Sequence, residues 1–317
     1  MTRQFWGLPI LLILLITACK QASNKQETTD TKSALELNVG VMSSMDFVPL
    51  AVAKEKGIFD RHHINVAIQK FYSANERDAA FQSGIIDGTV IDYTGAVLQK
   101  AGGVDLKITS ACNATFCIMV GPDSNISQLS DLKGKKVAVS RNTVIDFCIE
   151  AALNSAQTSP ESIEKQEINK IPIRFEMMMK GESDATALPD PFITMAQSKG
   201  ARSIVCMQDL DYVLTGFMFK TEAVNQKSEA LKAFYLAYNE AVEYIHTHPL
   251  DDIRSILVNE IGFPEALVDS VKLPDYTPAR MPREKDLNAT VEWLKQKDLI
   301  PSDFSAEGLA DNRFIQP

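Results

Sequence analysis

Apolar runs alternate with polar, helix-forming stretches through the first two thirds of the chain. Runs rich in β-branched residues at Leu37 to Met42, Ile64 to Phe71 and Ile85 to Asp92 predict strands, and polar segments that favour helices follow them. The pattern resumes near Phe116, where "FCIMVGP" predicts a strand and "LKGKKVAVS" predicts another that ends at Ser140. Strands that alternate with short helices are typical of an α/β fold with a parallel, doubly wound sheet.

Helical periodicity dominates the last third of the chain, and one earlier segment shares it. That segment, "IPIRFEMMMKG", would place Ile173, Met177 and Met178 on one helix face. Apolar residues between Ala230 and Ile245 recur at three and four positions, which predicts a long amphipathic helix that stops at Pro249. Further helices are expected over Asp251 to Glu260, Pro264 to Val271 and Arg283 to Lys297.

Two α/β series followed by helices predict two lobes, with a chain that crosses into the second lobe and later returns to the first. The crossings are expected near Asn113 to Phe116 and near Val213 to Phe217. The first lobe would then hold residues 36–112 and 218–317, and the second lobe residues 113–217. A chain of this length is long enough to bury a core in each lobe.

The N-terminal segment has the features of an export signal. Its apolar run, Leu8 to Ile16, is too short to span a bilayer, which takes about 20 apolar residues. The sequence "ITAC" that ends at Cys19 resembles the lipobox of bacterial lipoproteins, which implies a signal peptide over residues 1–18 and a lipid on that cysteine. Residues 19–35 are mostly polar and are expected to form a flexible tether. The protein is therefore expected in the cell envelope, anchored by its lipid to a membrane outside the cytoplasm.

Composition and motifs exclude several functions. The net charge of −9 argues against nucleic-acid binding, which needs a basic face. The four histidines do not fall in a metal-binding spacing, and CxxC, GxSxG and phosphate-loop motifs are absent from the sequence. We therefore expect no metal, no cofactor and no catalysis.

Four cysteines follow Cys19, and export would permit them to form disulfides. Two of them, Cys112 and Cys117, are near enough in sequence to pair if the local strand geometry allows it. The alternative is that the cysteines are buried free thiols. The four are Cys112, Cys117, Cys148 and Cys206.

Three stretches together resemble a known family. They are "VPLAVAKEKGIFDRHHINVAI", "LSDLKGKKVAVS" and "KGESDATALPDPF", in this order between Leu37 and Trp293. They resemble the periplasmic substrate-binding proteins of ABC importers, in the branch with binders of alkanesulfonates, taurine, nitrate and thiamine-precursor pyrimidines. The resemblance implies a two-lobed Venus-flytrap fold of type II with two hinge crossings. It also implies a small-molecule ligand in the cleft and delivery to an ABC permease and ATPase; we expect a monomer.

Candidate ligand-binding residues lie mainly in loops after predicted strands, because ligands of open α/β sheets bind beyond the carboxyl ends of the strands. Helix N-termini aimed at that edge offer free N–H groups. Helix capping is the alternative role for several of these polar residues. The candidates are Ser43, Ser44, Met45, Asp46, Tyr72, Ser73, Asp92, Tyr93, Asn113, Ser140, Arg141, Asn142, Thr143, Asp190 and Phe192.

The charges of these candidates bear on the ligand. Asp46, Asp92 and Asp190 are acidic whereas Arg141 is basic, so a solute with N–H donors or a positive charge would suit them better than a bare anion. Aromatic candidates would flank a flat ring. A nitrogen heterocycle such as a thiamine-precursor pyrimidine is therefore the expected solute.

Other solutes and roles stay open. The alternative solute is an alkanesulfonate, taurine or nitrate, held by Arg141 and the helix start beside it. A pyrimidine-synthesising enzyme of the same fold is less favoured, since the segment "ACNATFC" supplies only two cysteines. A ligand sensor cannot be told from an importer subunit by sequence.

Overall fold

The computed structural model describes residues 35–315. The expected signal peptide, the lipidated Cys19 and all but the last residue of the expected tether lie outside this range. Among the described residues, no helix combines the length and the apolar character that a membrane crossing requires.

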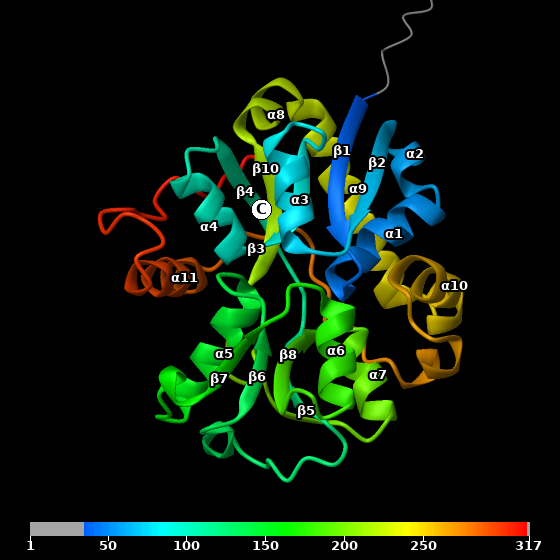
Figure 1. Cartoon of the computed structure of the whole chain (residues 1–317). Coiled ribbons are helices and arrows are strands. Elements are labelled where there is room, and N and C mark those ends of the chain that lie inside the picture. The colour runs from blue at the N-terminus through cyan, green and yellow to red at the C-terminus, as the bar shows by residue number, and fades with distance from the viewer. Residues whose placement is uncertain (1–34, 316–317) are drawn as a thin grey trace, which may run out of the picture. The chain divides into compact units, whose positions relative to one another are not determined.

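Two five-stranded sheets, each covered by helices, form the framework of the described residues (Figure 1). The first sheet has the order β2-β1-β3-β10-β4, with strands at Leu35–Met42 (β1), Ile64–Phe71 (β2), Gly88–Asp92 (β3), Leu106–Cys112 (β4) and Thr215–Lys220 (β10). The second sheet has the order β7-β6-β8-β5-β9, with strands at Phe116–Val120 (β5), Lys136–Val139 (β6), Glu164–Glu167 (β7), Ala185–Pro189 (β8) and Arg202–Cys206 (β9). The expected two-lobed α/β fold is confirmed, and we call the two halves the first and second lobe after their sheets.

Helices connect and cover the strands. The α-helices are α1 (Val48–Glu55), α2 (Ile58–Arg61), α3 (Ala74–Gln82), α4 (Tyr93–Ala101), α5 (Val144–Ser155), α6 (Ile171–Met179), α7 (Phe192–Ser198), α8 (Thr221–Gln226), α9 (Ser228–Thr247), α10 (Arg254–Ile256) and α11 (Glu284–Gln296). Short 3₁₀ helices lie at Met45–Phe47, Leu129–Leu132, Pro160–Ser162, Leu250–Ile253 and Glu265–Ser270, and a π-helical turn lies at Leu257–Ile261.

The sheets are mixed, and the expectation of purely parallel sheets is wrong. Strands β5 and β10 each follow a crossing between the sheets, and each runs antiparallel to both of its neighbours. An antiparallel strand needs no crossover helix, so the chain enters these strands from short connections at residues 113–115 and 207–214. Hydrophobic patterning along a strand carries no information about its direction, which is why the sequence did not reveal this.

Burial explains the elements that the sequence did predict. All five residues of β3 are buried, as expected for a central strand covered on both faces. Within it, Gly88 lies opposite Phe219, and a Cβ atom on this glycine would lie 2.1 Å from the Phe219 ring. The long helix α9 is confirmed, with its apolar stripe from Ala230 to Ile245 buried in the first lobe.

Two local predictions fail, and one strand was not predicted. The buried face of α6 consists of Arg174, Phe175 and Met178, whereas Ile173 is exposed. Strand β7 was not predicted, because its sequence "EKQE" has no apolar pattern. The two helices expected between Asp251 and Val271 are instead a succession of short 3₁₀, α and π turns.

Neither of the two alternatives left open for the cysteines describes all four. Cys117 and Cys206 are neighbours on the antiparallel strands β5 and β9, and they form a disulfide. Cys112 and Cys148 are buried and free. A pair between Cys112 and Cys117 is wrong because the first lies at the end of β4 and the second in β5, which belong to different sheets.

Candidate functional site

A cavity of about 70 Å³ lies between loops of the two lobes, at the carboxyl ends of β1, β3 and β6. This is the edge where open α/β sheets bind ligands. Its polar lining residues are Ser44, Asp46, Arg77, Asp92, Ser140, Thr143, Asn169, Arg174 and Thr215. Its other lining residues are Met42, Ala74, Val90, Ile91, Phe116, Val144, Ile145, Ile171 and Pro189.

Arg77 and Asp92 form a paired group on the first-lobe side. Ser73 caps α3 by accepting a hydrogen bond from the Glu76 N–H, and Arg77 follows one turn later. The guanidinium of Arg77 donates to Asp78 at 2.9 Å and to Asp92 at 3.5 Å. Although burial acts in the opposite direction, Asp78 and Asp92 raise the pKa of Arg77. Both ends of the Arg77–Asp92 pair are therefore neutralised within the protein.

Asp92 accepts from three donors of the protein, because it also caps a helix. One carboxylate oxygen accepts from the Gly95 N–H at 2.9 Å and from the Thr94 hydroxyl. Its other oxygen accepts from Arg77. Asp92 thus fixes the start of α4 and the position of Arg77.

Asp46 differs from Asp92, since no lysine or arginine of the described residues forms an ion pair with it. It lies in the 3₁₀ turn Met45–Phe47, is only 4% exposed, and accepts a hydrogen bond from the Ser44 hydroxyl. Burial raises the pKa of Asp46 to about 6, and the opposing influences of Ser44 and Arg77 do not cancel it. At neutral pH the cavity therefore contains a buried carboxylate that forms no ion pair with a described residue.

Arg174 is the corresponding group on the second-lobe side. It extends from α6, is 1% exposed, and its Nη1 donates to the main-chain oxygens of Ile168 and Asn169 at 2.9 and 3.2 Å. Its Nε has no hydrogen-bond partner among the described residues, and none of their carboxylates forms an ion pair with it. Burial alone lowers the pKa of Arg174 to about 10. A buried positive charge with an unused donor is an energetically costly arrangement unless an anion completes it.

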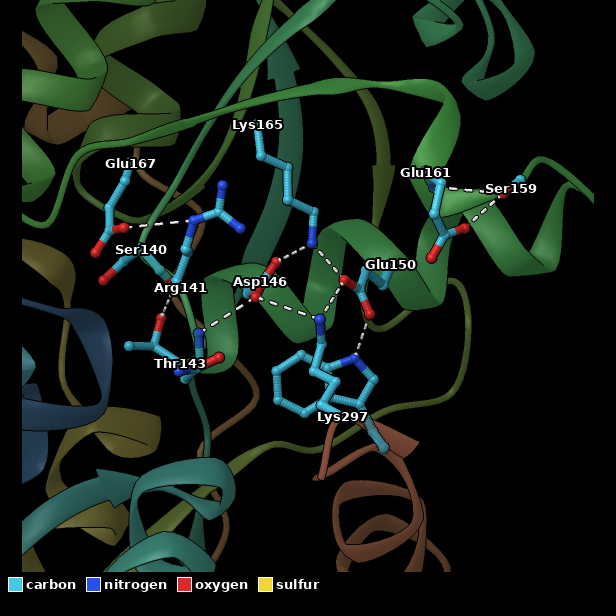
Figure 2. A network of polar contacts seen from close by, with 12 residues as sticks. Ser140, Arg141, Thr143, Asp146, Glu150, Ser159, Glu161, Lys165, Glu167 and Lys297 are labelled. Carbon is cyan, nitrogen blue, oxygen red and sulfur yellow. Dashed lines mark hydrogen bonds and ion pairs between the residues drawn. The ribbon is translucent and has the colours of Figure 1, made fainter. Parts of the chain in front are cut away.

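A polar loop between β6 and α5 adds hydroxyl groups to the same wall. Thr143 caps α5 by accepting from the Ile145 N–H, and its hydroxyl donates to the Ser140 carbonyl at 2.7 Å. The Ser140 hydroxyl donates to the Asn169 side chain at 3.0 Å. Asn142 adopts a positive φ of 60°, and its N–H donates to Asp146. Figure 2 shows this loop beside a larger polar network.

That network holds the loop in place from behind. Lys165 and Lys297 reach Asp146 and Glu150 from opposite sides (Figure 2). The indole N–H of Trp293 also donates to Glu150, at 2.6 Å. Although burial opposes the change, these bonds lower the pKa of Glu150. The network joins α5, β7 and the C-terminal helix α11 through charges that are all paired.

The structure brings five of the sequence-predicted residues to the cavity. These are Ser44, Asp46, Asp92, Ser140 and Thr143. Arg141 and Asn142 line a second hollow that shares Arg77, Asp92 and Thr143 with the cavity. There Arg141, half-exposed, forms an ion pair with Glu167 at 3.4 Å. Three further candidates, Ser43, Tyr72 and Phe192, line a third hollow that shares Met42 and Ile171 with the cavity.

The remaining candidates do not line the cavity. Met45 and Tyr93 are buried, and the Met45 carbonyl accepts from the Tyr276 hydroxyl. Asn113 donates to the Asp275 carbonyl at 2.9 Å. Asp190 accepts from the N–H and the hydroxyl of Thr194, and Ser73 caps α3.

Sequence reasoning missed the two buried arginines, Arg77 and Arg174. Each lies within a helix, whereas the predicted site residues were taken mainly from loops that follow strands. A signal was present for Arg174, because it is the one charged residue within the first five positions of the apolar helix "IPIRFEMMM". A charge on the buried face of such a helix points to a partner inside the protein or to a ligand.

Catalytic and metal chemistry find little support in the described residues. No group of three or more His, Cys, Asp or Glu side chains within them could hold a metal ion. His62 pairs with Glu240 away from the cavity, and burial raises the thiol pKa of Cys112 and Cys148. The cavity instead provides fixed charges and hydroxyls, which are suited to binding.

Comparisons with known proteins identify the family to which the chain belongs. The family model described as "NMT1/THI5 like" matches residues 44–251, which is more than half of the chain. A putative aliphatic sulfonates-binding protein of Bacillus subtilis is 22% identical over 97% of this chain and 95% of its own length. A putative thiamine biosynthesis protein of Haemophilus influenzae is 24% identical over 81% of this chain and 84% of its own.

A solved structure is similar across most of both chains. The periplasmic aliphatic sulphonate binding protein SsuA from Escherichia coli superimposes with a TM-score of 0.73 at 18% identity. The match covers 84% of this chain and 94% of SsuA. It confirms the expected periplasmic-binding-protein fold, and the family resemblance noted in the sequence is confirmed as well.

Proposed function

The chain belongs to the NMT1/THI5-like family, and we propose that it is the solute-binding subunit of an ABC importer that captures a small anion, such as a sulfonate, between its lobes. The B. subtilis relative and the E. coli structure, both named for sulfonate binding, support this choice of solute. The proposal replaces the heterocycle expected from the sequence as the first candidate.

Arg174 carries the proposal. A guanidinium keeps its proton at any physiological pH, so the protein has no means of neutralising this charge when the cavity is empty. Its guanidinium would donate to an oxygen of a sulfonate in a charge-assisted hydrogen bond. The hydroxyls of Ser140 and Thr143 lie on the same wall and would contribute further contacts.

A nitrogen heterocycle is the second candidate, and Asp46 favours it. The buried carboxylate would accept N–H bonds from a pyrimidine, and the H. influenzae relative is named for thiamine biosynthesis. We rank it second because Asp46 can take up a proton when the cavity is empty, whereas Arg174 cannot lose one under the same conditions.

Binding rather than catalysis is the proposed role, with lobe closure as its mechanism. A solute that contacts lining residues of both lobes, Arg174 among them, binds the closed state more tightly and shifts the population toward it. The closed form would then dock on the permease. A ligand sensor would use the same step, and the presence of neighbouring permease and ATPase genes would distinguish the two roles.

The location of the protein is part of the proposal. We propose a monomer in the cell envelope, tethered by a lipid on Cys19. The Cys117–Cys206 disulfide supports an oxidising compartment. Replacing Cys19 with Ser should release the protein from the membrane fraction, and a variant that stays there would contradict the anchor.

A thermal-shift screen tests the solute class. The panel would contain ethanesulfonate, 2-aminoethanesulfonate, nitrate, thiamine, pyrimidine precursors of thiamine, and sulfate. A solute that binds only the folded state raises the melting temperature with concentration. We expect a shift with a sulfonate for the wild type and none for Arg174→Gln.

A matched control separates loss of binding from loss of fold. Arg202 also donates to two main-chain oxygens, those of Ser124 and Ile126, but it lies outside the cavity lining. Arg202→Gln should keep the sulfonate shift. A shift with pyrimidines alone, unaffected by Arg174→Gln, would overturn the anion proposal and favour the second candidate.

A further inference from the structure

Helix α11 is attached to the first lobe by the segments on either side of it. Before the helix, Arg280 pairs with Ala111 of β4, whose N–H donates to the Arg280 carbonyl at 2.7 Å. After the helix, Ala310 pairs with Ile108 of the same strand. The helix itself packs against α4 (Figure 1). We therefore expect α11 to move with the first lobe whenever the lobes move relative to each other.

Two side chains at the C-terminal end of α11 contact α5, which belongs to the second lobe. The Trp293 indole N–H donates to Glu150 at 2.6 Å, and its ring packs edge-on against Phe147 with 5.6 Å between the ring centroids. Lys297, at the C-cap of the helix, donates to Glu150 at 2.7 Å and lies 3.8 Å from Asp146 (Figure 2). These contacts join the lobes at a place other than the two chain crossings.

We propose that these contacts are a clamp, in which Trp293 and Lys297 of the first lobe hold Glu150 of the second, and that the clamp increases the affinity for solute by stabilising the closed arrangement of the lobes. The inference rests on the lobe closure proposed above, but on no particular solute. Trp293 and Glu150 are 7% and 8% exposed, so water competes little for the hydrogen bond between them. Loss of either partner would leave a buried polar group unpaired.

The clamp acts on the wall of the cavity through α5. Glu150 lies seven residues, or roughly 10 Å along the helix, from Thr143, which caps the start of α5 and lines the cavity. Asp146 lies between them and accepts from the Asn142 N–H. Holding Glu150 against α11 therefore fixes the position of residues 140–143 relative to the first lobe.

Lobe opening would strain or break the clamp. Since α11 moves with the first lobe and Glu150 with the second, a rotation that opens the cleft lengthens their bonds unless its axis passes through Glu150. The nearby crossing is held separately, by ion pairs from Arg283 and Lys285 to Asp211. A solute binds the closed state, so whatever lowers the population of that state lowers the apparent affinity.

Two lysines separate a clamp between the lobes from a purely structural network. Lys165 of β7 and Lys297 both reach Asp146 and Glu150, the first from within the second lobe and the second from α11. Replacing either lysine with Met removes one cation from the same two acids, and both changes should lower the melting temperature. Only the loss of Lys297 removes a contact between the lobes.

Calorimetry and spin-label distances on the full chain test the clamp. The solute is the member of the thermal-shift panel that gives the largest shift. Lys297→Met should bind it at least fivefold more weakly than the wild type, whereas Lys165→Met should bind it within twofold of the wild type. Lys297→Arg keeps a cationic donor and should restore the affinity.

The distance measurement needs no solute. Spin labels would be attached to Ser83→Cys in the first lobe and Ser198→Cys in the second, both exposed and outside the cavity lining, in a Cys19→Ser background. The solute-free Lys297→Met protein should show longer distances between the labels than the unmodified lobes, and Lys165→Met should not. If no solute of the panel binds, the proposed function fails and these distances alone decide on the clamp.

Two results would overturn the clamp and leave solute binding standing. One is an unchanged affinity and an unchanged label distance in Lys297→Met. The other is an equal loss of affinity in Lys165→Met and Lys297→Met, which would mean that the network supports the loop from within the second lobe. If Lys297→Met does not fold, Trp293→Phe decides instead, because it loses the donor to Glu150 but keeps a ring beside Phe147. It should weaken binding at least twofold and lengthen the label distance, and no change in either would overturn the clamp.

Discussion

Two groups of buried charge lie on either side of the β6–α5 loop, and they differ in how they are compensated. Behind the loop, Asp146 and Glu150 are matched by Lys165 and Lys297, with Trp293 as a further donor. In front of it, Asp46 and Arg174 line the cavity without ion-pair partners among the described residues. Burying either group costs desolvation free energy, but only in the first group do ion pairs within the protein offset that free energy.

The difference separates structural charge from binding charge. A paired buried network keeps helices α5 and α11 together and holds the Asn142 turn through Asp146. An unpaired buried charge destabilises the solute-free protein. A solute that pairs with this charge removes that cost and therefore binds with higher affinity. Removing a charge should therefore have opposite effects on stability in the two groups.

The largest expected effect on stability comes from breaking the paired network. Glu150→Ala would leave Lys165, Lys297 and the Trp293 N–H without their shared acceptor. We expect a loss of about 3 kcal/mol in the free energy of unfolding, measured by urea denaturation. Glu161, an exposed acid that bonds with Ser159, provides the control, and Glu161→Ala should change the stability little.

The opposite sign is expected when the unpaired carboxylate is neutralised. Because burial raises the pKa of Asp46 from 3.8 to about 6, its ionised form destabilises the empty protein at neutral pH by about 3 kcal/mol. Asp46→Asn should raise the melting temperature of the solute-free protein. A fall in melting temperature at pH 8 would mean that the charge is compensated within the protein.

The pH dependence of that gain follows from the sign of the shift. The unfolded chain releases the Asp46 proton near pH 4 and the folded chain near pH 6, so the stability contributed by a protonated Asp46 is lost as the pH rises between these values. The stability difference between Asp46→Asn and the wild type should grow from pH 4 to 6 and level off above pH 7. Denaturation at several pH values would measure it.

The smallest effect is expected at the exposed arginine. Arg141 pairs with Glu167 on the surface, where such a pair contributes at most about 1 kcal/mol. Arg141→Ala should change the unfolding free energy by no more than this and weaken sulfonate binding less than threefold. A loss as large as that of Arg174→Gln would move the anion site from the cavity to the hollow that holds Arg141.

Periodicity predicted most of the fold, but not the relations between distant segments. The apolar stripe of α9 and the strand ending before Ser140 follow directly from local patterns. The Cys117–Cys206 pair depends on which strands lie side by side, and strand direction is likewise set by tertiary packing. The polar strand β7 has no local signal at all.

The candidate site was predicted in part for the same reason. Ser140, Thr143 and Asp92 stand where a strand ends and a helix begins, and loops of this kind can be found in a sequence. Arg174 lies within an apolar helix, and whether it faces the core, solvent or a cavity depends on how α6 packs. Without the two arginines, the candidate charges favoured a cationic solute; with them, the charged lining residues are two acids and two bases.

Calorimetry of sulfonate binding tests the central claim most directly. The wild type, Arg174→Gln and the control Arg202→Gln would be titrated at pH 7.5 with the sulfonate that gives the largest thermal shift. Since Arg174 is buried without an ion-pair partner among the described residues, Arg174→Gln should bind about tenfold more weakly or worse, and Arg202→Gln should bind as the wild type does. Equal affinity of the wild type and Arg174→Gln would contradict the account.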